Sequence, residues 1–192
     1  MAKKFNRERI MRLVLLALLT ATVIVLQMLP LQIGPLRLAV LALIPIVVGG
    51  ALLGPVAGGW LGFVFGMVIL LGPDVAPFWA FSVPGTILTI LLRGICAGAV
   101  GGLVYRLLEQ KNQFAAVLSA AITVPVVNTG LFVLGGLIFF LPLFEQWADG
   151  GSAVSFLFFG MIGVNFFIEL GITLLLSGVI LRIIQIWQKR RA

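Results

Sequence analysis

The stretch from Pro84 to Leu108, PGTILTILLRGICAGAVGGLVYRLL, decides the class of protein to which this chain belongs. It is uncharged except for Arg93 in its interior and Arg106 near its end. About 20 apolar residues suffice for a helix to cross the hydrocarbon core of a bilayer. We therefore predict a transmembrane helix that carries one cation deep in the membrane.

The rest of the 192-residue chain has the same character, because 61% of its residues are hydrophobic and only 10% are charged. A soluble domain carries about 25% charged residues, so this chain lacks the polar surface that contact with water requires. We predict an all-α integral membrane protein with six transmembrane helices. They form a single domain, residues 1–192, because six spans of about 20 residues leave no room for a soluble domain.

Proline, glycine and polar turns divide the chain into the six spans. The predicted helices are Arg12–Leu29, Leu36–Leu53, Val56–Leu71, Pro84–Leu108, Phe114–Leu141 and Phe156–Trp187. We expect the first to be a retained helix rather than a cleaved signal peptide, because more membrane segments follow it. Gly72–Val83 and Pro142–Ser155 are predicted to be loops. The third span contains four glycines, which should let another helix approach its backbone closely.

The positive charges indicate the orientation of the spans. Of the 13 Lys and Arg residues, all but Arg37 and Arg93 lie near the termini or in the turn Arg106–Lys111. Cytoplasmic segments of membrane proteins are enriched in positive charge. We therefore predict that both termini are cytoplasmic.

The net charge of +7 does not indicate a nucleic-acid partner. Its clusters at the chain ends follow from membrane orientation and can contact anionic lipid headgroups, and no basic face with interleaved aromatic residues is present. Cys96 is the single cysteine and the chain has no histidine. These counts exclude an internal disulfide, a multi-cysteine or histidine metal site and imidazole catalysis. We predict no enzyme activity, no cofactor and no metal.

Polar residues inside transmembrane spans are costly to bury, so each is a candidate for a ligand site. Arg93 lies roughly 13 Å below the outer end of its span at about 1.5 Å per residue, and Asn165 lies at a similar depth. Asn128 and Glu169 lie nearer the bilayer midplane. Thr86 lies one to two turns above Arg93. We expect these residues to converge on an outward-facing pocket in which Arg93 receives an anionic group.

The predicted outward loops add two further candidate ligand residues, Gln32 and Trp79, above this pocket. An alternative for tryptophan is the aromatic belt at the membrane interface. For the buried residues, the alternative is that Arg93 pairs with Glu169 while the asparagines hold helices together. The residues alone leave these alternatives open.

The first span contains a small-xxx-small pair, Ala17 and Ala21, in the string ALLTA. Small residues at this spacing let a second helix pack closely in a membrane. That second helix belongs either to this chain or to a partner.

Several motifs occur in a fixed order along the chain. They are the basic N-terminus, ALLTA at Ala17–Ala21, the Pro30–Pro35 break, PLRLAVLALIP at Pro35–Pro45 and GALLGPVAGG at Gly50–Gly59. In this order they resemble the substrate-binding S components of energy-coupling factor (ECF-type) vitamin transporters. The resemblance extends over essentially the whole chain.

The resemblance implies a subunit of the bacterial plasma membrane that captures a water-soluble vitamin from outside at high affinity. It implies as partners a transmembrane scaffold subunit and two ATP-binding subunits, with Ala17 and Ala21 contacting the scaffold. The chain contains no G-x-x-x-x-G-K-[ST] string for binding ATP. The energy for transport is therefore expected to come from the partners.

Three segments resemble the pantothenate-specific branch of that family. They are GPDVAPF at Gly72–Phe78, the Arg93-Gly94 pair and PVVNTG at Pro125–Gly130. The carboxylate of pantothenate would suit Arg93, and its hydroxyls and amide would suit asparagines. The alternatives are another vitamin such as folate or riboflavin, and a membrane scaffold or assembly protein without a transport role.

Overall fold

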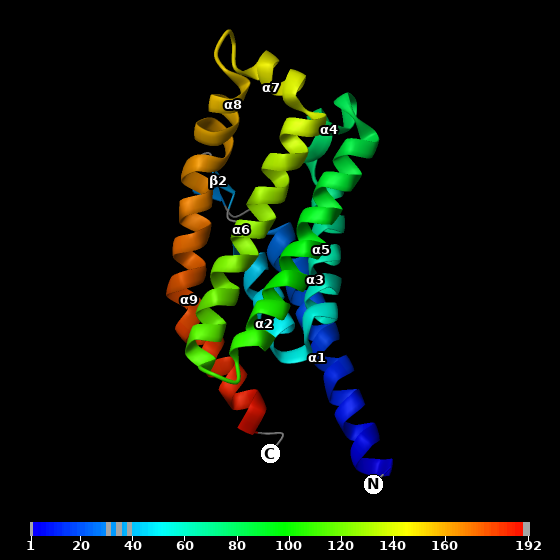
Figure 1. Cartoon of the computed structure of the whole chain (residues 1–192). Helices are drawn as coiled ribbons and strands as arrows, with labels where there is room; N and C mark the ends of the chain where they lie inside the picture. Colours follow the sequence, from blue (N-terminus) through cyan, green and yellow to red (C-terminus); the bar gives the residue numbers. More distant parts are fainter. Residues whose placement is uncertain (1, 30–31, 34–35, 38–39, 190–192) are drawn as a thin grey trace.

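The structure of the chain, a computed structural model, describes residues 2–29, 32–33, 36–37 and 40–189 (Figure 1). Its elements are α1 (Ala2–Met28), β1 (Gln32–Ile33), β2 (Leu36–Arg37), α2 (Val40–Leu53), α3 (Pro55–Leu70), η1 (Pro73–Val75), α4 (Ala76–Phe81), α5 (Val83–Leu108), α6 (Gln113–Phe139), α7 (Leu141–Trp147), α8 (Ala153–Ser155), η2 (Phe156–Ile162) and α9 (Gly163–Lys189). The strands β1 and β2 form a minimal antiparallel hairpin in which Gln32 lies opposite Arg37. η1 is a 3₁₀-helix, and η2 is wound as a π-helix.

The long helices run side by side in an elongated bundle (Figure 1). The start of α1 and the end of α9 lie at one end of this bundle, which we call the terminal end. The turns from α2 to α3 and from α5 to α6 lie toward the same end, whereas α4 and α7 lie at the opposite, distal end. Both described ends of the chain therefore lie at the same end of the bundle, while the side of the membrane on which they lie remains a prediction.

Four helices of the described residues are long and apolar enough to cross a membrane: Glu8–Met28, Val83–Leu108, Gln113–Phe139 and Phe166–Trp187. A fifth candidate combines α3 with Pro73–Phe81, which bends by 75° at the break. The apolar part of α2, Leu41–Leu53, is shorter. The prediction of a helical architecture with candidate membrane spans is confirmed, apart from the short β1–β2 hairpin. Six spans and cytoplasmic termini remain predictions.

The predicted boundaries are wrong in two proline-containing segments. Leu36–Arg37 is a strand, so the second helix begins at Val40 rather than Leu36. The predicted loop Gly72–Val83 contains η1 and α4, in which Pro73 and Pro77 occupy the first turn. Proline is tolerated at that position because its missing N–H would have no helical partner.

The region before the last long helix also differs from the prediction. Pro142 sits in the first turn of α7, so Pro142–Ser155 is partly helical. The segment beginning at Phe156 starts as a π-helix and becomes α-helical only at Gly163. Because π-helices are rare and occur mostly as short insertions, the sequence pattern did not reveal it.

The tightest contact in the bundle joins α3 to α5 through glycines, as expected for the glycine-rich third span. A Cβ atom added at Gly62 would overlap the backbone carbonyl of Gly94, and one added at Gly98 would overlap that of Gly58. We call these four residues the glycine seam. Their backbones touch directly, so any side chain at Gly62 or Gly98 would force the helices apart.

The contact between α6 and the segment formed by η2 and α9 is different. A lateral groove of about 530 Å³ separates them, lined by Val126, Thr129, Gly130, Val133, Val154, Ser155, Phe158, Phe159, Ile162, Gly163, Phe166 and Phe167. Gly130 and Gly171 have no described atom within 4 Å of the position that a Cβ would take. Among the described residues, neither of these glycines makes the direct backbone contact found between α3 and α5.

Candidate functional site

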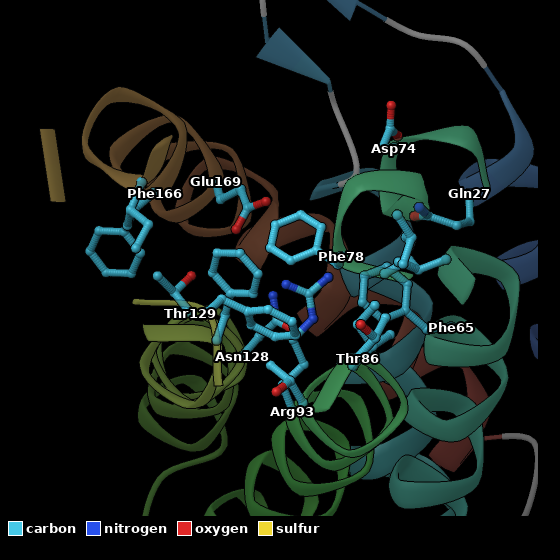
Figure 2. A pocket seen from close by; sticks show the side chains of 17 residues that line it. Gln27, Phe65, Asp74, Phe78, Thr86, Arg93, Asn128, Thr129, Phe166 and Glu169 are labelled. Atoms are coloured by element: carbon cyan, nitrogen blue, oxygen red, sulfur yellow. The ribbon is translucent and has the colours of Figure 1, made fainter. Parts of the chain in front are cut away.

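A cavity of about 260 Å³ lies inside the bundle toward its distal end (Figure 2). The lining residues come from eight helical elements: Gln27, Phe65, Ile69, Asp74, Val75, Phe78, Thr86, Thr89, Ile90, Arg93, Asn128, Thr129, Phe132, Phe140, Ile162, Phe166 and Glu169. The wall is therefore largely aromatic and aliphatic, with a small set of polar groups. Ligand sites for small molecules have this composition.

Four polar atoms of the cavity wall are buried without a hydrogen-bond partner in the described part of the chain. They are Gln27 Oε1, Thr89 Oγ1, Arg93 Nε and Asn128 Oδ1. A buried polar atom left unsatisfied costs about 1–3 kcal/mol. Two of these atoms accept hydrogen bonds, one only donates and the threonine hydroxyl does both. Together they form a recognition pattern for a polar ligand.

Arg93 comes from the middle of α5, immediately before Gly94 of the glycine seam. Its guanidinium carbon lies 4.9 Å from the ring centroid of Phe132, which is a cation–π distance. Figure 2 shows the guanidinium in the centre of the cavity. The close α3–α5 packing fixes the backbone that carries Arg93, and the Phe132 ring contacts its guanidinium.

Glu169 reaches the same cavity from α9 and is only 7% exposed. Figure 2 shows its carboxylate on the far side of the cavity from the α5 backbone. Arg93 and Glu169 attract each other electrostatically. Among the residues that the structure describes, however, they form no ion pair within 4.0 Å. In this structure Arg93 is therefore not occupied by a direct pair with Glu169.

Thr86 lines the cavity, but its hydroxyl donates to the carbonyl of Ser82 at 2.7 Å. Its oxygen can still accept a hydrogen bond from a ligand. Trp79 is not among the described lining residues; its indole N–H donates to the carbonyl of Leu70 at 3.3 Å. Trp79 therefore ties α4 to the end of α3.

Two predicted ligand residues fall where side chains are not described. Asn165 belongs to α9, four residues before Glu169, and its side chain lies outside the described part of the structure. Gln32 belongs to β1, and its side chain lies outside it as well. The predictions for these two residues remain predictions.

Phe78 of α4 closes the distal side of the cavity. Its ring makes edge-on contacts with Phe132, Phe140, Phe144 and Trp147 at centroid distances of 6.2, 5.0, 6.2 and 5.8 Å. Aromatic pairs of this kind contribute about 0.5–1.5 kcal/mol each beyond their buried area. The short α4 is thus attached to both α6 and α7 by one side chain.

Ala17 and Ala21 are exposed on α1. The neighbouring Thr20 accepts a hydrogen bond from the indole of Trp60 on α3 at 3.2 Å, so this edge of α1 faces the bundle. The exposed side continues with large apolar side chains such as Leu18 and Val25. The two small alanine side chains therefore leave a depression in an apolar face of α1, and the described chain does not cover this face.

Sequence reasoning missed Gln27 and Thr89. The sequence could have marked Gln27 as a candidate, because it is an uncharged polar residue close to the outer end of a predicted span. It could not have marked Thr89, since a threonine inside a helix usually satisfies its hydroxyl with a backbone carbonyl one turn earlier. Only the fold shows that the Thr89 hydroxyl is buried at the cavity without such a bond.

Comparison with known proteins identifies the family of the chain. Neither the search of curated proteins nor that of solved structures returned a match. Residues 11–181 match the family described as ECF transporter, substrate-specific component. The match covers most of the chain, including every described residue that lines the cavity. The chain therefore belongs to the family of substrate-specific components of ECF transporters.

Proposed function

We propose that this chain captures a small water-soluble vitamin from outside the cell at high affinity, with pantothenate as the best candidate. Its family makes it a transport subunit that works with an ECF module and a vitamin-type substrate. The proposal goes further by assigning the binding site to the cavity around Arg93. The observation that carries it is the set of four unsatisfied polar atoms converging there.

The polar groups match the chemistry of pantothenate. The carboxylate of the vitamin accepts charge-assisted hydrogen bonds from Arg93. Its hydroxyls and amide N–H donate to Asn128 Oδ1 and Gln27 Oε1, which lack partners in the described structure. Asn165 is proposed as a further contact and Gln32 as part of the cover above the site. Glu169 and Thr86 complete the polar wall.

The size of the cavity favours a compact vitamin. Its 260 Å³ lies just below the range of about 300–1,000 Å³ that is usual for small-molecule sites. Pantothenate is a short, flexible acid, whereas riboflavin and folate carry fused ring systems that need more room. Those two vitamins are the alternatives that a binding experiment must include.

The decisive experiment is titration calorimetry of the purified protein with pantothenate, riboflavin and folate. Arg93→Gln should weaken pantothenate binding at least about tenfold, because a charge-assisted contact contributes about 1.5–3 kcal/mol. Arg93→Lys should restore only part of the affinity, since an ammonium lacks the guanidinium fork. Arg182→Gln, which removes an exposed arginine from α9, is the matched control and should bind normally.

A structural role for Arg93 predicts a different result. If Arg93 only neutralises Glu169, the double variant Arg93→Gln with Glu169→Gln should fold and bind with normal affinity. That outcome would remove Arg93 from the ligand site. Tighter binding of riboflavin or folate than of pantothenate would leave the proposed site in place but assign it to a different vitamin.

We further propose that the exposed face at Ala17 and Ala21 receives the scaffold subunit, with two ATP-binding subunits completing the complex. Small residues on an uncovered helix face permit close approach of a partner helix. Ala17→Trp or Ala21→Trp should abolish uptake in cells while pantothenate binding to the isolated chain is retained. Equal loss of both would show that α1 packs differently.

The proposed topology has six spans with both termini cytoplasmic, in the bacterial plasma membrane. The 14 residues of α2 extend about 21 Å at 1.5 Å per residue, less than the roughly 30 Å of a hydrocarbon core. The crossing would therefore have to include the segment that precedes α2. Cysteines placed at Lys111 and Asp74 in a Cys96→Ala background should react with an impermeant reagent from opposite sides; same-side labelling would refute this topology.

A further inference from the structure

A second polar cavity, of about 190 Å³, lies at the terminal end of the bundle. Its lining includes Arg12 of α1, Gly54 between α2 and α3, Arg106 and Glu109 at the end of α5, and Trp187 of α9. Four separate parts of the chain thus contribute to one site. It lies at the opposite end of the bundle from α4, which borders the cavity around Arg93.

Trp187 gives the first indication of a ligand. Its indole Nε1 is buried and has no hydrogen-bond partner among the described residues. An indole nitrogen can only donate, so it needs an acceptor. The two guanidinium groups beside it are also donors only. Three donor side chains face a single carboxylate, that of Glu109, which leaves the site one positive charge in excess.

The turn from α2 to α3 forms one wall of this cavity. Gly54 has φ = 102°, and Pro55 begins α3 directly after it without a side-chain cap. The start of α3 carries a partial positive charge, and the end of α2, which also lines the cavity, carries a partial negative charge, so the excess positive charge comes from the arginine side chains. The guanidinium carbon of Arg106 lies 3.5 Å from the position that a Cβ of Gly54 would take, so the absence of a side chain at Gly54 leaves room for Arg106 beside the turn.

The depth of the site indicates the kind of ligand. Arg106 and Trp187 lie at the very ends of the candidate spans Val83–Leu108 and Phe166–Trp187, and Arg12 lies near the start of Glu8–Met28. All three therefore sit at one boundary of the hydrocarbon core. The groups available at that level are lipid headgroups, and tryptophan is enriched there. Basic pockets between spans bind phosphate-containing headgroups.

We propose that this cavity binds the phosphodiester of an anionic glycerophospholipid, such as phosphatidylglycerol, in the leaflet at the terminal end. Arg12, Arg106 and the indole N–H of Trp187 donate to the phosphate oxygens. The bound lipid joins α1, α5 and α9, which reach this cavity from separate positions in the chain. This site is independent of which vitamin the other cavity takes.

The test uses the full-length protein in dodecyl maltoside, a detergent without phosphate, titrated with phosphatidylglycerol. Native mass spectrometry measures the fraction of protein that retains one lipid, and thermal unfolding measures the stabilisation that saturation produces. Arg12→Gln and Trp187→Phe should each weaken lipid retention roughly tenfold, the effect expected for losing a hydrogen bond to a charged group. Arg12→Lys should retain part of the affinity.

Arg182→Gln is the matched control, because it removes an exposed arginine of α9 that is not part of this cavity. Its lipid retention should be unchanged. Equal weakening in Arg182→Gln would show diffuse attraction between charges and would overturn the site. Equal binding of diacylglycerol, which lacks the phosphate, would overturn it as well.

Soluble sn-glycerol 3-phosphate separates a lipid from a free phosphate compound. It should fail to produce the saturable stabilisation, and saturation by it would overturn the lipid assignment. Each variant must show the wild-type elution volume and unfolding temperature before lipid is added. If Trp187→Phe fails this check, Arg12→Gln alone decides between the outcomes.

Discussion

Two helix contacts flank the cavity around Arg93, and glycine has opposite roles in them. Between α3 and α5, glycines bring two backbones into direct contact. Between α6 and α9 a groove of about 530 Å³ remains, and Gly130, which lines it, has no described neighbour within 4 Å. Gly171 of α9 has no described neighbour within 4 Å either. The same residue type therefore accompanies direct backbone contact in one place and an absence of described close neighbours in the other.

The difference divides the cavity wall into two parts. Arg93 and Thr89 stand on α5, whose backbone the glycine seam fixes. Glu169 stands on α9, which follows the π-helical turns of η2. Thr129, Ile162 and Phe166 line both the cavity and the lateral groove, so this wall is one side chain thick. We expect the α5 side to define the ligand position and the α9 side to adjust to it.

The largest effect should come from filling the glycine seam. Gly62→Ala or Gly98→Ala should lower the stability of the fold by about 3 kcal/mol or more, because the methyl group would overlap a backbone that cannot move aside. Thermal unfolding in detergent measures the change. Gly171→Ala, also inside a long helix, is the control and should be neutral or stabilising by up to about 1 kcal/mol. Similar losses at both positions would refute the contrast between the two contacts.

A smaller difference should appear in hydrogen exchange. Amides of α5 between Gly94 and Gly102 should be more protected than those of η2, by about 2 kcal/mol or roughly 30-fold. Tight packing restricts opening in the first segment, whereas π-helical turns are rare and intrinsically less favourable. Mass spectrometry of exchanged peptides measures both. Saturating ligand should slow exchange in η2 more than in α5; equal protection without ligand would argue against a loose wall.

The smallest effect concerns single hydroxyl groups. Thr89→Val should weaken vitamin binding roughly fivefold, about 1 kcal/mol for one hydrogen bond, without destabilising the empty protein. The reason is that the Thr89 hydroxyl has no partner in the described structure. Thr173→Val is the control, because its hydroxyl already donates to the carbonyl of Glu169 at 2.7 Å and it does not line the cavity. Calorimetry should show unchanged affinity for Thr173→Val. An equal loss of affinity in the two variants would show that Thr89 does not act through contact with the ligand.

The two glycine patterns also show how far sequence reasoning extended. The glycines of α3 correctly predicted a close helix contact, because a helix face without side chains lets a second backbone come near. The sequence did not show that α5 was the partner, nor that Gly171 of α9 would face open space. Pairing depends on which faces meet in three dimensions, and the spacing within one helix does not contain that information.

By itself, the sequence determined that this protein is a helical membrane protein of the ECF substrate-specific family with a costly cation in a span. Those conclusions follow from apolar length, charge placement and motif order, all local properties. Only the tertiary structure decided that Gln27, Thr89, Arg93 and Asn128 share one cavity while Trp79 binds the carbonyl of Leu70. Residues on different helices face the same cavity only if each helix is rotated to point them there. That rotation depends on all the helix contacts together, so the sequence of one helix does not reveal it.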